Sequence, residues 1–181
     1  MRKEHPLTEQ KIGVTDVVDR LAAPLDLDAF RDAMASFPTG VTIVSTVDDL
    51  GFPHGLTASS FCSVSLRPPL VSFCVATSAN CYPAFARCER FAVNILRPQH
   101  AALALRFASK RPDKFTDSGF RRTPSGLLVF DDALSILECR VYDRYPGGDH
   151  SIVVGEVLGA HTEPGTPLVY VDRTFTRVTG R

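Results

Sequence analysis

The sequence predicts a mainly β protein with short helices, in which many short strands close into a barrel. Apolar and β-branched runs of four to eight residues recur along the chain between turn signals. Helical periodicity is confined to a few short segments. The strands do not alternate with long helices, so the βαβ pattern of a parallel sheet is absent. These observations together favour a barrel with two or three helices packed on it.

The composition indicates one ordinary globular domain. The chain has 181 residues, of which 44% are hydrophobic. Lys plus Arg and Asp plus Glu are both 20, which argues against a nucleic-acid or membrane-surface partner bound by bulk charge. No apolar run approaches the roughly 18 residues of a membrane helix, and no apolar signal core follows the N-terminus. We therefore expect a cytoplasmic protein, with an arm or tail over residues 1–25 and one domain over residues 26–181.

The first predicted element of the domain is an amphipathic helix over residues 28–37. Phe30 and Phe37 fall on the same helical face, and an aspartate before the helix can cap it. A β-branched strand follows over residues 40–47, then a turn, then a strand that enters a segment rich in hydroxyl groups.

The later elements are again short. Residues 70–76 form a continuous apolar run, which predicts a buried strand. Helices are expected from Pro83 to Arg87 and over 99–107, and a turn over 145–150. The other expected strands are 91–96, 127–130, 134–142, 151–158, 168–171 and 175–178.

The segment Gly55–Pro69 carries the clearest chemical signal. It reads Gly-Leu-Thr-Ala-Ser-Ser-Phe-Cys-Ser-Val-Ser-Leu-Arg-Pro-Pro. A hydroxyl group removed from water without a partner costs about 1–3 kcal/mol. The hydroxyl groups therefore either face water on a half-exposed strand or meet a polar ligand. Both interpretations are open at this point.

This segment resembles the short-chain flavin reductase family, in which a Gly-x-Thr-Ala-Ser-Ser-Phe-like run followed by Ser-x-x-Pro-Pro lines a flavin. Similar segments extend from about Phe30 to Phe175. The resemblance implies an FMN-binding split β-barrel with a Greek-key-like order of strands. It also implies a homodimer with flavin at the subunit boundary, and a flavin-dependent monooxygenase that receives reduced flavin.

The resemblance also implies a set of flavin-binding residues. Hydroxyl groups near Thr57 would serve the ring edge and the ribityl chain, and the loop before Pro83 would serve the phosphate. Capping of the following helix is the simpler explanation of that loop. The implied cofactor-binding residues are Thr57, Ala58, Ser59, Ser60, Cys74, Val75, Ser78, Asn80, Cys81, Arg106 and Phe107.

The run Gly147-Gly-Asp-His150 matches a further motif of the family. There the histidine faces the nicotinamide, so we predict that His150 is the catalytic-site residue that orients NADH or NADPH. Arg173 is a weaker candidate for the adenine half of that nucleotide. A Cys74 nucleophile activated by His150 is a rival arrangement that nothing in the sequence supports.

The predicted function is an NAD(P)H:flavin oxidoreductase that uses FAD or FMN. The chain lacks Gly-x-Gly-x-x-Gly, so it would bind the nicotinamide nucleotide without a Rossmann fold. It also lacks the close histidine spacing of a zinc site, and we expect no metal. The alternative is a flavin carrier or sensor without catalysis on the same barrel. A split-barrel oxidase of pyridoxamine phosphate fits the motifs less well.

Overall fold

The computed structural model describes residues 24–178, which fall into two compact units separated between Ser36 and Phe37. The first unit contains helix α2, Leu27–Ala35, close to the predicted helix. Asp26 caps it by accepting a hydrogen bond from the backbone N–H of Asp28 at 3.0 Å. The predicted arm lies outside the described residues except for its last two.

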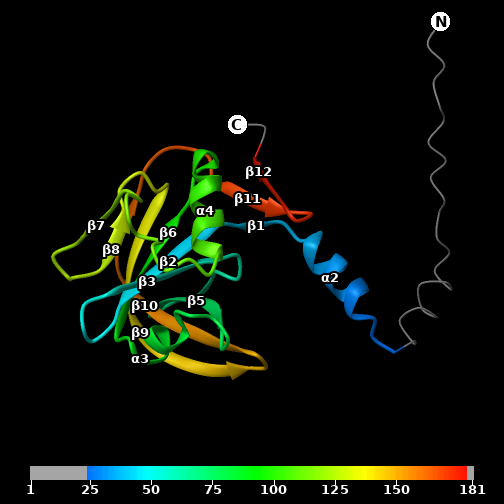
Figure 1. The fold of residues 1–181 in the computed structure, drawn as a ribbon, viewed down its shortest axis with the longest axis horizontal. Helices are drawn as coiled ribbons and strands as arrows, with labels where there is room; N and C mark the ends of the chain where they lie inside the picture. Colours follow the sequence, from blue (N-terminus) through cyan, green and yellow to red (C-terminus); the bar gives the residue numbers. More distant parts are fainter. Residues whose placement is uncertain (1–23, 179–181) are drawn as a thin grey trace, which may run out of the picture. The chain divides into compact units, whose positions relative to one another are not determined.

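The second unit is mainly β with short helices, as the sequence predicts (Figure 1). Its helical elements are α3 (Tyr82–Arg87), η1 (Pro98–His100) and α4 (Ala101–Ala108). Its strands are β1 (Thr39–Gly40), β2 (Thr42–Val47), β3 (Pro53–Ala58), β4 (Cys62–Leu66), β5 (Pro69–Ala76), β6 (Arg90–Ile95), β7 (Phe120–Arg122), β8 (Leu128–Phe130), β9 (Ser135–Gly147), β10 (His150–Thr162), β11 (Leu168–Val171) and β12 (Thr174–Arg177).

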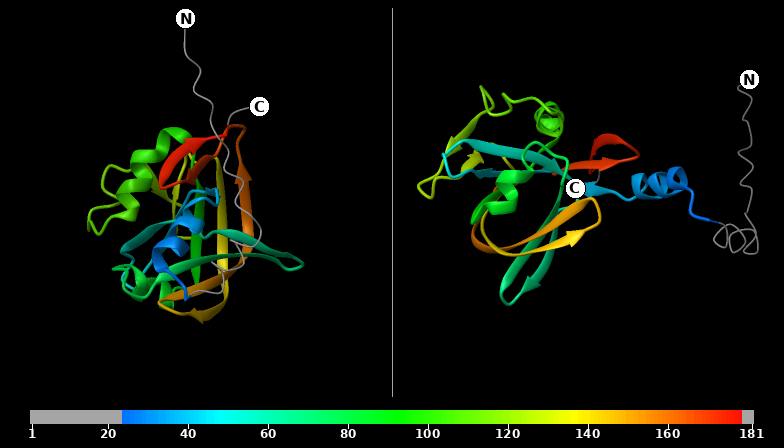
Figure 2. Two further views of the ribbon diagram at one scale, coloured as in Figure 1. Left: turned by 90° about the vertical axis from the view of Figure 1, so that its right-hand side faces the viewer. Right: turned by 60° about the horizontal axis from the view of Figure 1, so that its bottom comes forward.

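Seven strands form the main sheet, in the order β3-β2-β6-β9-β10-β5-β4. Every pair in it is antiparallel, and β5 and β6 follow each other in the chain but lie apart in the sheet. The sheet is strongly curved (Figure 2). Its edge strands β3 and β4 do not pair with each other, so closure of the sheet into a barrel stays a prediction. One face of β5, with Leu70, Ser72, Cys74 and Ala76, is only half-buried, and we call it the uncovered face.

The interior of the curved sheet is filled by aromatic and β-branched side chains. Phe73 packs edge-on against Phe85 and Phe91, with ring centroids 5.6 and 5.1 Å apart. A second cluster is centred on Phe107 of α4, whose ring contacts Phe115 at 4.9 Å. Since Phe73 and Phe107 are fully buried at the centres of these clusters, they fix β5 and α4 as rigid supports.

Three local predictions differ from the structure. The apolar run 70–76 is buried on one face only, because the side chains of β5 alternate between the core and the uncovered face. The predicted turn over 145–150 is a two-residue hairpin, and β9 and β10 are both longer than expected. Strand β4 was not predicted as a separate element.

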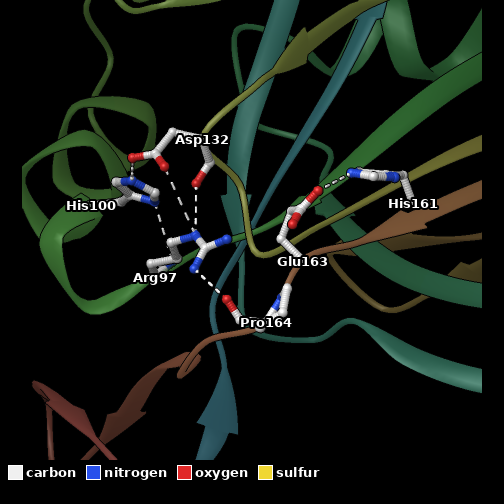
Figure 3. A network of polar contacts seen from close by, with 6 residues as sticks. All are labelled: Arg97, His100, Asp132, His161, Glu163 and Pro164. Atoms are coloured by element: carbon white, nitrogen blue, oxygen red, sulfur yellow. Dashed lines mark hydrogen bonds and ion pairs between the residues drawn. The ribbon is translucent and has the colours of Figure 1, made fainter.

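A polar network anchors the start of the α4 segment (Figure 3). Arg97 Nε donates to the backbone oxygen of Asp132 at 3.0 Å, and its Nη1 donates to that of Pro164 at 3.0 Å. His100 Nδ1 accepts from the backbone N–H of Arg97, so its Nε2 carries the proton that it shares with the Asp132 carboxylate at 2.9 Å. Among residues 24–178, no helix is long and apolar enough to cross a membrane.

Candidate flavin site

A cavity of about 440 Å³ opens beside the uncovered face of β5. This volume is within the range of small-molecule sites. Ten of the thirteen residues predicted from the sequence line it, and three do not. Those that line it are Thr57, Ala58, Ser59, Ser60, Cys74, Ser78, Asn80, Cys81, Phe107 and His150.

The end of β3 forms the hydroxyl-rich wall of the cavity. Thr57 Oγ1 donates to the backbone oxygen of Ala104 in α4 at 2.6 Å. Ser60 Oγ accepts from the backbone N–H of Cys74 at 2.9 Å. Thr57 can therefore only accept a hydrogen bond from a ligand, whereas Ser60 keeps its proton to donate. The hydroxyl groups of Thr57 and Ser60 thus form hydrogen bonds between the end of β3 and its neighbours within the protein.

Strand β5 forms the second wall with one of its two faces. Cys74 and Ala76 line the cavity, whereas Phe73 and Val75 belong to the core. The side chain of Val75 is 1% exposed and points away from the site, because successive side chains alternate across a strand. Val75, which was predicted as a cofactor-binding residue, therefore does not line the cavity.

The loop before α3 closes one end of the cavity. Asn80 Nδ2 donates to the backbone oxygen of Lys110 at 3.5 Å, toward the loop after α4. The N-cap of α3 is Cys81, and no side chain caps the helix there. Helix capping is therefore not what Ser78 and Asn80 do. Burial raises the pKa of the Cys81 thiol, which remains protonated at neutral pH.

The β9–β10 hairpin, which is hydrogen-bonded to the loop before α3, also borders the cavity through His150. Its two-residue loop contains Gly148 with φ of 67°, a conformation that favours glycine. The backbone oxygen of Asp149 accepts from both the N–H and the hydroxyl group of Thr77, at 2.9 and 3.0 Å. Since His150 pairs with Ala76 in the register, its side chain stands on the cavity face of the sheet.

His150 has a defined orientation through its neighbour. Its Nδ1 lies 2.7 Å from Asp149 Oδ1, and this hydrogen bond lowers the pKa of the Asp149 carboxyl group. The contact leaves Nε2 as the nitrogen available to a ligand. Cys74 shares the cavity with His150, but the polar contact that the structure gives to the histidine is to Asp149.

Two predicted arginines do not line the cavity. Arg106 was predicted as a cofactor-binding residue, and its Nη2 donates to the backbone oxygens of Asp113 and Thr116. It therefore holds the loop after α4 in place. Arg173 lies in the turn between β11 and β12, with φ of 59°.

Lys114 is the cavity residue that the sequence prediction left without a role. Its Nζ donates to the backbone oxygens of Gly55 at 3.2 Å and Phe107 at 2.8 Å. Partial burial lowers the pKa of this ammonium group, whose charge is next to Cys81. Lys110 and Ser109 also line the cavity. The only signal in the sequence was that Lys114 belongs to the charged run Ser109-Lys-Arg-Pro-Asp-Lys-Phe115.

These residues fit a flavin. Leu56, Ala76 and Ala79 provide half-buried apolar walls for a flat ring, and the hydroxyl groups of Ser59 and Ser60 provide polar edge contacts. The two lysines provide positive charge for a phosphate. An ideal Cβ on Gly55 would lie 2.9 Å from the rings of Phe107 and Phe115, so glycine is needed for this close packing.

Comparison with known proteins gives one consistent result. Residues 34–179 match the flavin reductase like domain. The chain is 52% identical over 151 residues to the actinorhodin polyketide dimerase of Streptomyces coelicolor, covering 83% of this chain and 85% of the relative. It is 33% identical to HsaB of Mycobacterium tuberculosis, a reductase subunit of a flavin-dependent monooxygenase, covering 87% and 86%. The NADH:FAD oxidoreductase SgcE6 of Streptomyces globisporus, solved with NAD and FAD fragments, superposes with a TM-score of 0.80 at 34% identity, covering 87% and 98%.

Proposed function

This chain belongs to the flavin reductase family, and from that premise we propose that it is an NAD(P)H:flavin oxidoreductase. The observation that carries the proposal is the meeting of three segments on one cavity. These are the end of β3, the loop before α3 and the hairpin that bears His150. A flavin site needs the first two, and only a site for a second substrate needs the third.

The residues of the cavity bind and orient two substrates. The apolar wall of Leu56, Ala76 and Ala79 packs against the flavin ring, and Ser59 and Ser60 meet its polar edge. Lys114 attracts the phosphate end. The flavin, when bound, supplies the ring that accepts a hydride from the reduced nicotinamide.

His150 orients the nicotinamide over that ring. Its Nδ1 is held by Asp149, so Nε2 can contact the carboxamide of the nucleotide. Hydride transfer depends on alignment of the two rings, and no side chain is required as an acid. The role of His150 is therefore positioning.

The proposal includes a partner and an assembly. HsaB is a reductase subunit of a monooxygenase, which supports the supply of reduced flavin to a partner monooxygenase. A homodimer and a cytoplasmic location complete the proposal, both as expected from the sequence.

The test is anaerobic stopped-flow mixing of the protein and FAD or FMN with NADH or NADPH. We expect rapid bleaching of the flavin absorbance with at least one pair. His150→Ala should slow bleaching at least tenfold and change the flavin Kd less than threefold. His161→Ala removes an exposed histidine that pairs with Glu163 at 2.8 Å, and serves as the matched control. Tight flavin binding without bleaching would favour the carrier or sensor instead.

The 52% identity to a polyketide dimerase supports a second candidate, the dimerisation of a polyketide. Incubation of the protein with a polyketide, flavin and NADH in air, where dioxygen is the oxidant that takes up the two hydrogen atoms lost on coupling, distinguishes the two candidates. A coupled product that requires this chain, and that a different flavin reductase cannot replace, would establish the second activity. Product formation with any source of reduced flavin would leave reductase as the function.

A further inference from the structure

A second cavity of about 420 Å³ adjoins the candidate flavin site. The two cavities share Asn80, Cys81 and Lys114, which all stand at the proposed phosphate end of the first. The second cavity continues from there between the turn before β3 and the loop after α4. A ligand that extends beyond the first phosphate would enter it.

The walls of the second cavity suit a planar base attached to phosphate. Phe52 and Pro112 line it, and the Phe52 side chain is 62% exposed although it is a large apolar group. Such an exposed aromatic ring in a cavity is available to stack on a base. Arg111 lines the same space, and with Lys110 and Lys114 it makes three cations around the two cavities. The carboxylate of Asp113 is the negative charge among these groups, so the net charge of the four side chains is positive and favours phosphate groups.

The loop that carries these cations is held in place before any ligand binds. Arg106 donates to the backbone oxygens of Asp113 and Thr116. Arg111 forms a two-point ion pair with Asp113, with distances of 3.0 and 2.7 Å. Lys114 joins the loop to Gly55 at the wall common to both cavities. A preformed wall lowers the entropy cost of binding.

We propose that the second cavity binds the adenosine 5′-phosphate half of FAD while the flavin ring occupies the first, with Phe52 stacking on the adenine. This proposal rests on the proposed function and deepens it, because it makes FAD rather than FMN the preferred flavin. NADH carries the same adenosine phosphate. The geometry favours FAD, since the residues that the two cavities share include Asn80 and Lys114, whereas His150 lines only the first cavity.

The experiment compares equilibrium binding of oxidised FAD and FMN by fluorescence titration. We expect the wild-type protein to bind FAD more tightly than FMN. Phe52→Ala should raise the ratio of the FAD Kd to the FMN Kd at least about fivefold, or about 1 kcal/mol. Leu50→Ala is the matched control, because Leu50 is an 82% exposed side chain of the same turn that does not line the cavity. Arg111→Gln is the second variant, and should raise the same ratio.

Two further measurements decide whether FAD or NADH places its adenosine phosphate in the second cavity. AMP should compete with FAD for the wild-type protein and should not compete with FMN. The KM for NADH with FMN as acceptor should be the same in wild type and Phe52→Ala. A raised KM for NADH would assign the cavity to the nicotinamide nucleotide and overturn the assignment to FAD.

The remaining outcomes are equally decisive. An unchanged Kd ratio in both variants would overturn the proposal. So would equal affinity of the wild-type protein for FAD and FMN, even though the proposed reductase function would stand. A protein that binds neither flavin would refute the proposed function itself.

Discussion

Replacing Lys114 by methionine tests whether one positioned cation organises the flavin site. The ammonium group donates to the backbone oxygens of Gly55 in β3 and Phe107 in α4, and so joins two elements beside the cavity. Methionine keeps a similar apolar stem and removes the charge and both hydrogen bonds. The substitution therefore separates the role of the charge from that of packing.

The expected loss of stability is modest. A hydrogen bond from a charged donor contributes about 1.5–3 kcal/mol, but the ammonium group also loses hydration in its half-buried position. Its lowered pKa shows that burial disfavours the charged form. We therefore expect a net loss of about 1–2 kcal/mol and a Tm about 2–8 °C lower.

The expected loss of flavin affinity is larger in proportion. A unit charge about 6 Å from a phosphate contributes roughly 3 kcal/mol at an effective dielectric constant near 20, and salt reduces this. About 1–2 kcal/mol should remain, so the Kd of FMN should rise about 5- to 30-fold. The difference between wild type and variant should shrink as salt is raised, because screening already weakens the wild-type contact.

The FMN Kd is measured by fluorescence titration at two salt concentrations, and the Tm of each protein by a thermal melt. Lys110→Met is the control, because Lys110 is an exposed cation on the same loop and lines the same cavity. An FMN Kd for Lys114→Met within twofold of wild type would refute the reasoning. An equal effect of Lys110→Met would show that net charge matters and position does not.

Two further predictions concern the scaffold. Gly155→Ala would place a Cβ against the buried ring of Phe91, and overpacking should cost about 1–3 kcal/mol in a denaturant melt. Gly159→Ala, on the same strand with no atom within 4 Å of the added Cβ, should change stability far less, and equal losses would contradict the packing argument. The hydrogen bond from His100 lowers the pKa of Asp132, so its contribution to stability is present above about pH 4 and is lost as pH falls through the folded-state value. Asp132→Asn should therefore flatten the acid side of the stability curve, and an unchanged acid limb would exclude this pair as a source.

The sequence predicted the type of most elements, because local patterns determine them. The helix near Phe30 and the strand over 42–47 have the periodicity of their final structure. The β9–β10 hairpin was predicted too short, since Pro146 and Gly147 favour a turn when read locally. Pairing with β10 keeps both residues in the strand, so a contact across the sheet overrides the local preference.

The sequence predicted which segments of the chain line the cavity, but not which of their side chains point into it. Motif resemblance placed Val75 and Arg106 near the flavin together with their neighbours. Strand alternation directs the Val75 side chain into the core. The guanidinium group of Arg106 donates through Nη2 to a backbone oxygen of the loop after α4. Neither outcome can be read from residue types, because each depends on which face of an element meets the cavity.

Lys114 shows why part of the site cannot be predicted from the sequence alone. It lies 59 residues from Gly55 in the chain, and its ammonium group reaches the Gly55 backbone oxygen only because α4 packs against β3. The same packing brings the Phe52 turn beside the loop of Arg111 and creates the second cavity. In an unfolded chain neither lysine nor arginine is distinguishable from other surface cations. The fold brings Lys114 and Arg111 to the two cavities, and the relative affinity of the protein for FAD and FMN measures the effect of that placement.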